Sequence, residues 1–205
     1  MNIGIIGSGR IGATAAKLFV GAGHPVAISN SRGPESLNGL IGELGPGARA
    51  ATPAGAAEFG EMVLVAIPFG RYGDLPKAEL GSRIVIDAMN HYAARDGEVD
   101  LGGRTSSELV AEALPGARVV KAFNTMNSHT LGTESTEDPD RRLVLFVAGD
   151  DEEAKAAVAE LIREIGFVAV DTGSLAEGGR RQEPGSPVYN KPMTEPEARE
   201  ALKPA

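Results

Sequence analysis

The chain has 205 residues, of which 42% are hydrophobic, so it is long enough to form an α/β domain with a substantial core. Its net charge of −8 argues against a protein that coats nucleic acid or an anionic membrane, and the absence of cysteine excludes disulfides, thiol catalysis and cysteine-ligated metals. It has three scattered histidines, no apolar stretch of membrane-spanning length and no signal peptide pattern, so we expect a cytoplasmic protein without a metal site.

The first half of the chain alternates short apolar runs with helical patterns. The predicted elements are, in chain order, a strand at 2–7, a helix from Ile11 to Phe19, a strand at 25–29, a helix at 34–44, a short edge strand at 48–52, and strands at 62–67 and 83–88. The last two strands are apolar on both faces, which is typical of central parallel strands.

The second half continues the alternation. Its predicted elements are a helix at 105–114, strands at 117–123 and 142–149, a helix that Asp150 caps with Glu153 in capping-box spacing, and a strand at 167–170. From Gly178 onward we expect irregular structure packed on the rest. Because strands alternate with helices throughout, the pattern predicts an α/β fold with a Rossmann-type, doubly wound, mostly parallel sheet and a short C-terminal extension.

A glycine-rich loop, "GSGRIG", follows the first predicted strand and opens the first predicted helix. In this context Gly7 permits a tight turn, Gly9 lets a pyrophosphate approach, and Gly12 lets helix and strand pack closely. Phosphates would lie on backbone N–H groups at the helix N-terminus, where the helix dipole favours anions. The alternative is a plain strand–helix turn. We expect a dinucleotide, bound by Gly7, Ser8, Gly9, Arg10, Ile11 and Gly12.

The end of the second predicted strand carries no acidic residue before Glu35. An NAD site has a carboxylate there, which binds the ribose 2′-hydroxyl and would repel a 2′-phosphate. Instead, Ser31 offers a hydroxyl and Arg32 a guanidinium fork, both suited to phosphate, and Asn30 stands beside them. We therefore expect NADP, against the alternative that Arg32 is incidental on an exposed turn.

Three further loops leave predicted strands at their carboxyl ends, where ligands bind in open α/β sheets. In "AIPF", Ile67 and Pro68 are expected beside the cofactor, and Phe69 is expected to pack on it. The loops "DAMNHY" and "AFNTMNSH" supply candidates to line the nicotinamide or second-substrate site, which are Asn90, Asn124, Thr125 and His129. For each of these the alternative is a residue that caps a loop.

Six sequence segments, taken together and in their order along the chain, indicate a known family. They are "IGIIGSGRIGATAAKL", "NSRGPESL", "AIPF", "SSELVAEALPGARVVKAFN", "AGDDEEAK" and "VDTGSLAEG". In this order they resemble F420-dependent NADP oxidoreductases and their relatives, among them the cytosolic reductase domain of membrane ferric reductases. The resemblance covers nearly the whole chain. It implies a Rossmann fold, NADPH on the glycine loop, Ser31 and Arg32 on its 2′-phosphate, and hydride transfer to a deazaflavin (F420) or flavin.

Two features depart from the deazaflavin enzymes. No second base follows Arg32 before Arg49, and Asn124 stands where those enzymes can carry a histidine, so this loop is more similar to the ferric-reductase relatives.

Hydride transfer between two ring cofactors depends on stacking the rings and excluding water more than on an acid or base. We therefore expect an NADP-dependent oxidoreductase with no certain catalytic residue, in which Asn124, Thr125 and His129 position the rings. One alternative is an NADPH-dependent reductase of a small imine or carbonyl compound, with Tyr92 or His129 as proton donor. Another is a sensor that binds NADPH without turnover.

The chain is expected to form a single NADP-binding Rossmann domain over 1–205. Its core covers about residues 1–125, and a strand–helix–strand unit with a tail covers 126–205. Only about 35 residues follow the last predicted strand, too few for the helical substrate domain of related small-molecule reductases. A partner subunit would then complete the nicotinamide side of the site, so we expect a homodimer that acts on a small-molecule electron acceptor.

Overall fold

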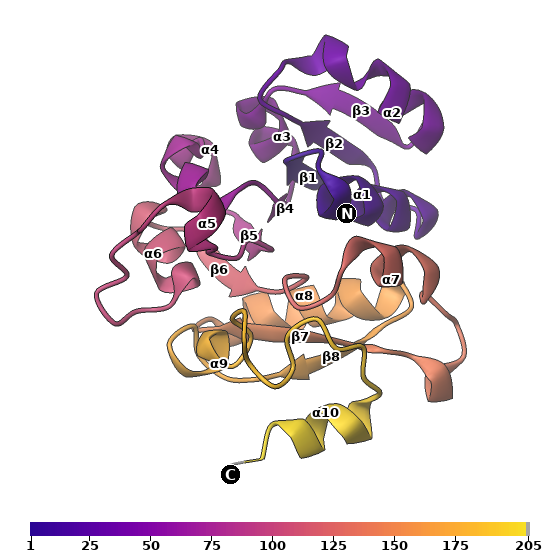
Figure 1. Ribbon diagram of the computed structural model, residues 1–205. Coiled ribbons are helices and arrows are strands. Elements are labelled where there is room, and N and C mark those ends of the chain that lie inside the picture. The colour runs from indigo at the N-terminus through magenta and orange to yellow at the C-terminus, as the bar shows by residue number, and fades with distance from the viewer. Residues whose placement is uncertain (204–205) are drawn as a thin grey trace.

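The computed structural model describes residues 1–203, and within them it contains one eight-stranded sheet in the order β3-β2-β1-β4-β5-β6-β7-β8 (Figure 1). The strands are β1 Ile3–Ile6, β2 Val26–Ser29, β3 Ala48–Ala51, β4 Met62–Val65, β5 Ile84–Asp87, β6 Arg118–Lys121, β7 Val144–Gly149 and β8 Val168–Asp171. Neighbouring strands run parallel except β6 and β7, which pair antiparallel. The predicted mostly parallel Rossmann-type sheet is confirmed.

Helices connect the strands and cover both faces of the sheet (Figure 1). The α-helices are α1 Arg10–Gly21, α2 Asn38–Leu44, α3 Pro53–Phe59, α4 Lys77–Leu80, α5 Ala93–Asp96, α6 Ser106–Ala113, α7 Ser128–Thr133, α8 Glu152–Glu164, α9 Glu177–Arg180 and α10 Glu195–Ala201. Short 3-10 helices are η1 Pro34–Leu37, η2 Phe69–Asp74 and η3 Pro139–Arg141. The helix predicted over 34–44 is therefore divided between η1 and α2.

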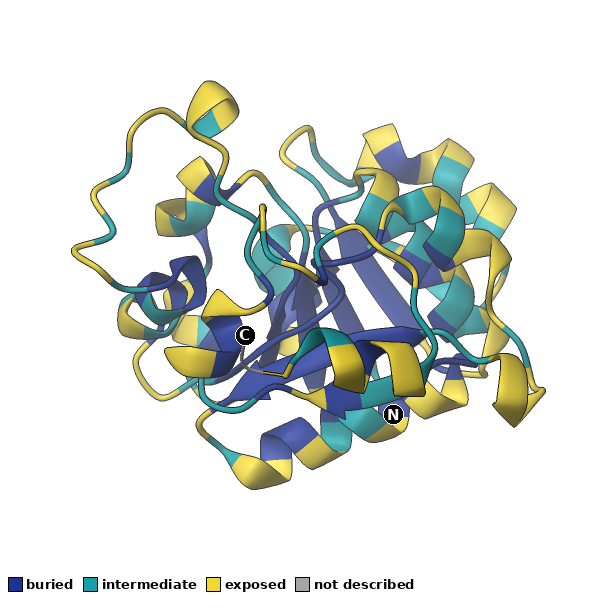
Figure 2. Cartoon of the chain, turned by 60° about the horizontal axis from the view of Figure 1, so that its bottom comes forward, coloured by how far each residue is buried: buried dark blue, intermediate teal, exposed yellow. Residues whose placement is uncertain are grey.

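The core lies in two layers, one on each face of the sheet. In β5, Ile84 and Ile86 pack into a cluster with α1 and α8, whereas Val85 packs into a second cluster with α3 and α6. Successive strand residues point to opposite faces, so a strand covered on both sides must be apolar at every position. Figure 2 shows the result, with buried central strands between helices that expose their outer faces.

The start of α8 differs from the prediction. Asp151, not Asp150, caps this helix, because its carboxylate accepts the N–H of Ala154 at 2.8 Å. Asp150 instead accepts the backbone N–H of Leu175 at 3.0 Å, which ties the end of β7 to the segment before α9. The expected capping box between Asp150 and Glu153 is therefore wrong, since the helix begins one residue later.

The tail after Gly178 is partly helical, which corrects the expectation of irregular structure. Thr194 caps the N-terminus of helix α10, and its backbone N–H donates to the Glu197 carboxylate at 2.8 Å. Ala198 of this helix packs into an apolar cluster with Val144 of β7 and Val188 of the tail. Within residues 1–203, no helix combines the length and apolar character needed to cross a bilayer.

Candidate functional site

The glycine loop between β1 and α1 has glycine where the backbone requires it. Gly7 has a φ of +112°, and a Cβ there would lie 2.3 Å from the carbonyl oxygen of Ala66. A Cβ on Gly12 would lie 1.8 Å from the carbonyl oxygen of Gly7, so α1 packs against β1 only without a side chain at this position. Ser8, which follows Gly7 in this loop, is half-buried.

Gly9 differs from these two glycines. It is exposed, has a φ of −69°, and a Cβ there would meet no atom within 4 Å. It is also the N-cap of α1, and no side chain caps this helix or places a negative charge in its first turn. The first N–H groups of the helix therefore remain available to an anion in the open space beside Gly9. This arrangement fits the pyrophosphate of a dinucleotide.

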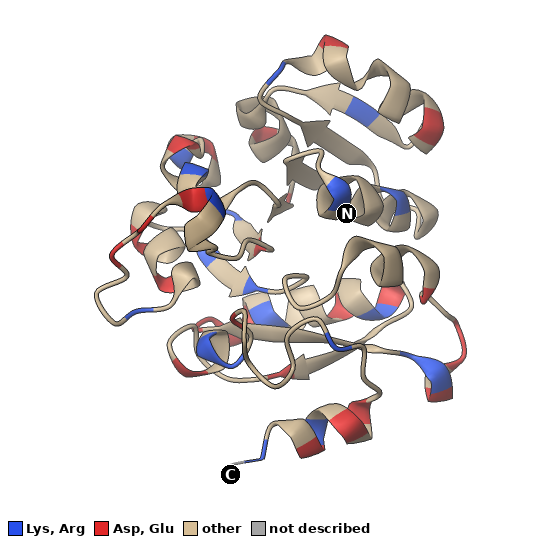
Figure 3. Cartoon of the chain, viewed as in Figure 1, with Lys and Arg blue, Asp and Glu red and all other residues tan. Residues whose placement is uncertain are grey.

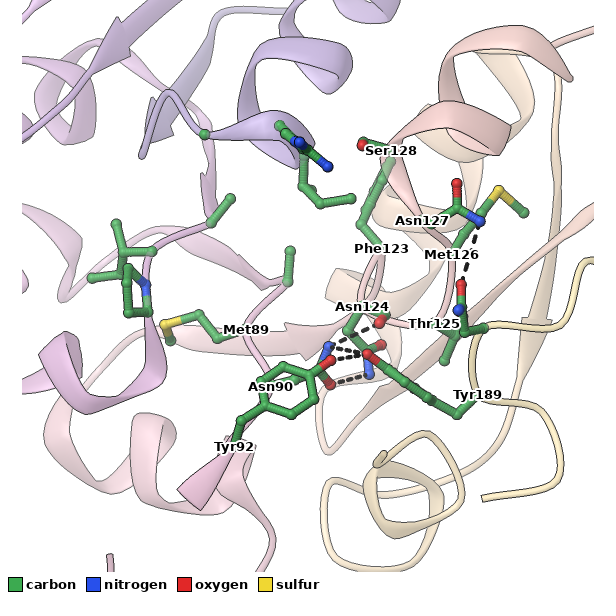
Figure 4. Close-up of a pocket in the computed structure, with 18 of the residues that line it drawn as sticks. Met89, Asn90, Tyr92, Phe123, Asn124, Thr125, Met126, Asn127, Ser128 and Tyr189 are labelled. Atoms are coloured by element: carbon green, nitrogen blue, oxygen red, sulfur yellow. Dashed lines mark hydrogen bonds between the residues drawn. The ribbon is translucent and has the colours of Figure 1, made fainter. Parts of the chain in front are cut away.

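A cleft of about 390 Å³ runs from this loop across the carboxyl ends of β4, β5 and β6 (Figure 4). The sheet places these ends side by side, since β1, β4, β5 and β6 are consecutive parallel neighbours. The predicted site residues that the cleft brings together are Gly9, Arg10, Ile11, Ile67, Pro68, Asn90, Asn124 and Thr125.

The segment predicted to select NADP lies at the same edge of the sheet but outside this cleft. The N–H of Gly7 donates to the carbonyl of Ser29 at 3.0 Å, which joins the end of β2 to the glycine loop. The Asn30 side chain accepts the backbone N–H of Arg32 at 2.9 Å and thereby shapes the turn. Ser31 and Arg32 are exposed, so their side chains are free to meet a ligand that extends past the loop.

Two predicted site residues lie elsewhere. Phe69 was expected to pack on the cofactor, but its side chain is fully buried in the core and stacks on Tyr72, with ring centroids 5.0 Å apart. His129 was expected to border the nicotinamide, but it is exposed on α7 in a separate groove beside Lys17 of α1. The cause is the N-cap of α7. The Asn127 side chain accepts the N–H of Thr130, so the helix begins directly after Asn127 and leads the chain away from the cleft.

A buried polar cluster holds the turn after β5 in place. Asp87 and Lys121 are register partners on β5 and β6, and both side chains are fully buried (Figure 3 marks the charged positions). Ser107 donates to the Asp87 carboxylate at 2.6 Å, and the Lys121 ammonium donates to Ser107 at 2.9 Å and to the carbonyl of Met89 at 3.3 Å. The cluster therefore fixes the backbone that presents Asn90 to the cleft.

Asn90 and Asn124 form a paired amide network at the floor of the cleft (Figure 4). The Nδ2 of Asn124 donates to the carbonyl of Gln182 at 2.9 Å and to the Oδ1 of Asn90 at 3.1 Å. Because the Gln182 carbonyl only accepts, this contact fixes which end of the Asn124 amide faces it. The Oδ1 of Asn124 is buried and has no hydrogen-bond partner within residues 1–203.

The C-terminal tail supplies one wall of the cleft, which the sequence analysis did not foresee. Tyr189 and Asn190 line it, and the N–H of Asn190 donates to the carbonyl of Thr125 at 2.8 Å. The hydroxyl of Tyr189 is hydrogen-bonded to that of Tyr92. Nothing in the local sequence "PVYNKP" signals this role, because the contacts join segments far apart in the chain. Tyr92, expected as a proton donor if the acceptor is a small imine or carbonyl compound, also lines the cleft. Further unpredicted lining residues are Ala66, Ala88, Met89, Arg95, Phe123, Met126, Asn127 and Ser128.

Arg95 of helix α5 lines the cleft, and Asp96 of the same helix holds it in place. Arg95 donates to the carbonyl of Asn90 at 2.7 Å and forms an ion pair with Asp96 at 2.8 Å. The hydrogen bond from Arg95 is the main cause that lowers the pKa of Asp96 to about 2, helped by the backbone N–H of Tyr92. The same bond raises the pKa of Arg95, so both groups stay charged at neutral pH.

Residues 2–91 match the family described as NADP oxidoreductase, coenzyme F420-dependent. The chain is 31% identical over 177 residues to Metalloreductase STEAP3 of Rattus norvegicus, covering 85% of this chain and 34% of that protein. The chain thus spans about a third of the length of the curated relatives it matches.

Two solved structures resemble the whole chain. One is the hypothetical protein SMa0349 of Sinorhizobium meliloti, which is 35% identical, with a TM-score of 0.83 and 95% of each chain covered. The other, from Arthrobacter sp. FB24, is provisionally described as an F420-dependent NADP-reductase. It is 25% identical, with a TM-score of 0.74, and covers 95% of this chain and 100% of that one.

Proposed function

Because this chain belongs to the F420-dependent NADP oxidoreductase family, we propose that it transfers a hydride between NADP(H) and a deazaflavin or flavin-type acceptor. The observation that carries the proposal is the continuous cleft. It joins the open glycine loop at α1 to the amide network of Asn90 and Asn124 at the ends of β5 and β6. One end suits the phosphates of the dinucleotide, and the other suits a polar ring edge.

The phosphate end of the site selects NADP. The first N–H groups of α1 receive the pyrophosphate beside Gly9, where no side chain obstructs it. Arg32 and Ser31 bind the 2′-phosphate from the end of β2. Within residues 1–203 no carboxylate lies within 4 Å of the Arg32 guanidinium, so binding a phosphate does not require the loss of an internal ion pair.

At the far end of the cleft the chain positions the ring system. When bound, NADPH supplies the hydride. Asn124 lines this region, and its amide is held in place because its Nδ2 donates to the carbonyl of Gln182 and to Asn90. Met89, Met126 and Phe123 line the same region and exclude water from the rings.

One assay tests the proposal. Oxidation of NADPH is followed by absorbance with F420, FMN, FAD, a ferric chelate and a panel of imines and carbonyls as separate acceptors. We expect turnover with F420 or a flavin, and a KM for NADPH about 10- to 100-fold higher in Gly9→Ala, whose methyl group obstructs the pyrophosphate. Turnover with imines or carbonyls alone would establish a small-substrate reductase instead. Tight NADPH binding with no turnover on any acceptor would favour the sensor.

A further inference from the structure

Two tyrosine hydroxyls meet at the acceptor end of the cleft. Tyr92 immediately precedes α5, Tyr189 lies in the C-terminal tail, and their hydroxyls are hydrogen-bonded (Figure 4). The Nδ2 of Asn90 lies 3.5 Å from the Tyr189 hydroxyl and donates toward it. Both tyrosines line the cleft that begins at the glycine loop.

The tail holds Tyr189 firmly at this position. On one side of it, Val188 is buried in the apolar cluster with β7 and α10. On the other side, Asn190 donates its N–H to the carbonyl of Thr125 at 2.8 Å, and its side chain accepts from Asn127 at 3.3 Å. Arg95 packs on Tyr92, because its guanidinium lies over the Tyr92 ring at 5.0 Å from the ring centroid.

The surroundings of the pair keep Tyr189 protonated. Its partial burial is the largest cause that raises its pKa, and its hydrogen bond with Tyr92 raises it further. The charge of Arg95 lowers the pKa of Tyr189, but this guanidinium is already paired with Asp96. Tyr92 is 37% exposed, so its hydroxyl connects the half-buried Tyr189 to bulk water.

We propose that Tyr189 donates the proton that accompanies hydride transfer, and that Tyr92 relays its replacement from solvent. This inference rests on the proposed function. As the hydride adds to a carbon of the acceptor, or to the corresponding ring nitrogen of a flavin, the electron pair of the C=O, C=N or conjugated bond moves onto another heteroatom. The O–H bond of Tyr189 then breaks and an O–H or N–H bond forms on the acceptor. The resulting phenolate takes a proton from Tyr92, which takes one from water.

This chemistry narrows the class of acceptor. NADPH gives up a hydride and the acceptor gains that hydride and one proton, which together are two electrons and two protons, so the acceptor is an organic molecule whose reduced form carries a new O–H or N–H bond. A ferric chelate, which takes single electrons and needs no such proton, is not the acceptor at this position.

Tyrosine-to-phenylalanine variants test whether Tyr189 is the proton donor, and the same change at Tyr72 is the control. The chain has three tyrosines, and the third, Tyr72, lies outside the cleft with its ring stacked on Phe69. With the best organic acceptor, Tyr189→Phe should lower kcat by about 100-fold or more, because a positioned proton donor contributes about that factor. Tyr72→Phe should leave kcat unchanged, and NADPH affinity should be unaltered in both variants.

A second readout needs no turnover. In a spectroscopic pH titration of the ligand-free protein, Tyr189 should stay neutral to a higher pH than an ordinary tyrosine. Tyr92→Phe should lower the pKa of Tyr189, because it removes a hydrogen-bond partner.

The outcomes separate this inference from the proposed function. Wild-type turnover with an organic acceptor, together with a Tyr189→Phe variant within about twofold of wild type, would overturn the proton-donor assignment alone. A Tyr189 that ionises in the ordinary range for a tyrosine would also overturn it. A wild-type protein that turns over no organic acceptor would overturn both.

Discussion

Replacing Gly9 with alanine separates folding from cofactor binding. Gly9 has an ordinary φ of −69°, is exposed, and has no atom within 4 Å of the position a Cβ would take. The protein should therefore fold normally. The change from glycine to alanine reduces the freedom of the unfolded chain but weakens an N-cap, so stability should change by no more than about 1 kcal/mol.

The effect on the cofactor should be much larger. The new methyl group would occupy the space in front of the first N–H groups of α1, where the pyrophosphate is expected. If it displaces the phosphate far enough to lose one charge-assisted hydrogen bond, the loss is about 1.5–3 kcal/mol. This corresponds to a reduction in NADPH affinity of about 10- to 100-fold.

Calorimetric titration with NADPH and a thermal melt measure the two effects. Gly21→Ala is the matched control, because Gly21 lies at the other end of α1 and a Cβ there also meets nothing within 4 Å. This control should bind NADPH like wild type. Gly12→Ala should fail to fold, since its Cβ would lie 1.8 Å from a carbonyl oxygen. A folded Gly9→Ala variant with wild-type NADPH affinity would refute the placement of the pyrophosphate.

Four further predictions concern other parts of the molecule. Arg32→Ala should weaken NADPH binding about 10- to 100-fold without altering NADH binding, measured by titration of both. Lys121→Met leaves the buried Asp87 charge unpaired and should lower the free energy of unfolding in urea by about 3–5 kcal/mol. Asp96 has its pKa lowered to about 2, so its pairing with Arg95 stabilises the fold above about pH 4 and is lost toward pH 2. Asp96→Asn should therefore cost about 1–2 kcal/mol at pH 7, and the difference from wild type should vanish near pH 2 in denaturant titrations. The expected homodimer should appear in light scattering at micromolar concentration, and a fully active monomer would contradict it.

The sheet and the glycine loop could be predicted because their signals are local. A strand covered on both faces must be apolar at each position, as β4 and β5 are, and this is visible in a few consecutive residues. Likewise, the turn at Gly7 and the close packing at Gly12 each demand glycine for reasons set within one loop. The positions of Asn90 and Asn124 followed from a rule about the carboxyl ends of parallel strands.

The remaining features depend on contacts between distant segments. Tyr189 reaches the cleft only because the tail folds back over the loop after β6, 97 residues beyond its partner Tyr92. His129 was misplaced because the cap of α7 turns the chain away from the cleft. Phe69 was misplaced because the chain turns its side chain into the core. One missed feature did leave a signal, since Asp87 and Lys121 put opposite charges on adjacent apolar strands.

The central claim is that the chain uses NADPH, bound at the glycine loop and at the end of β2. Calorimetric titration of the wild-type protein with NADPH and NADH under one set of conditions tests it most directly. The 2′-phosphate contact of Ser31 and Arg32 predicts a dissociation constant for NADPH about 10- to 100-fold below that for NADH. Equal dissociation constants for the two cofactors would contradict the account.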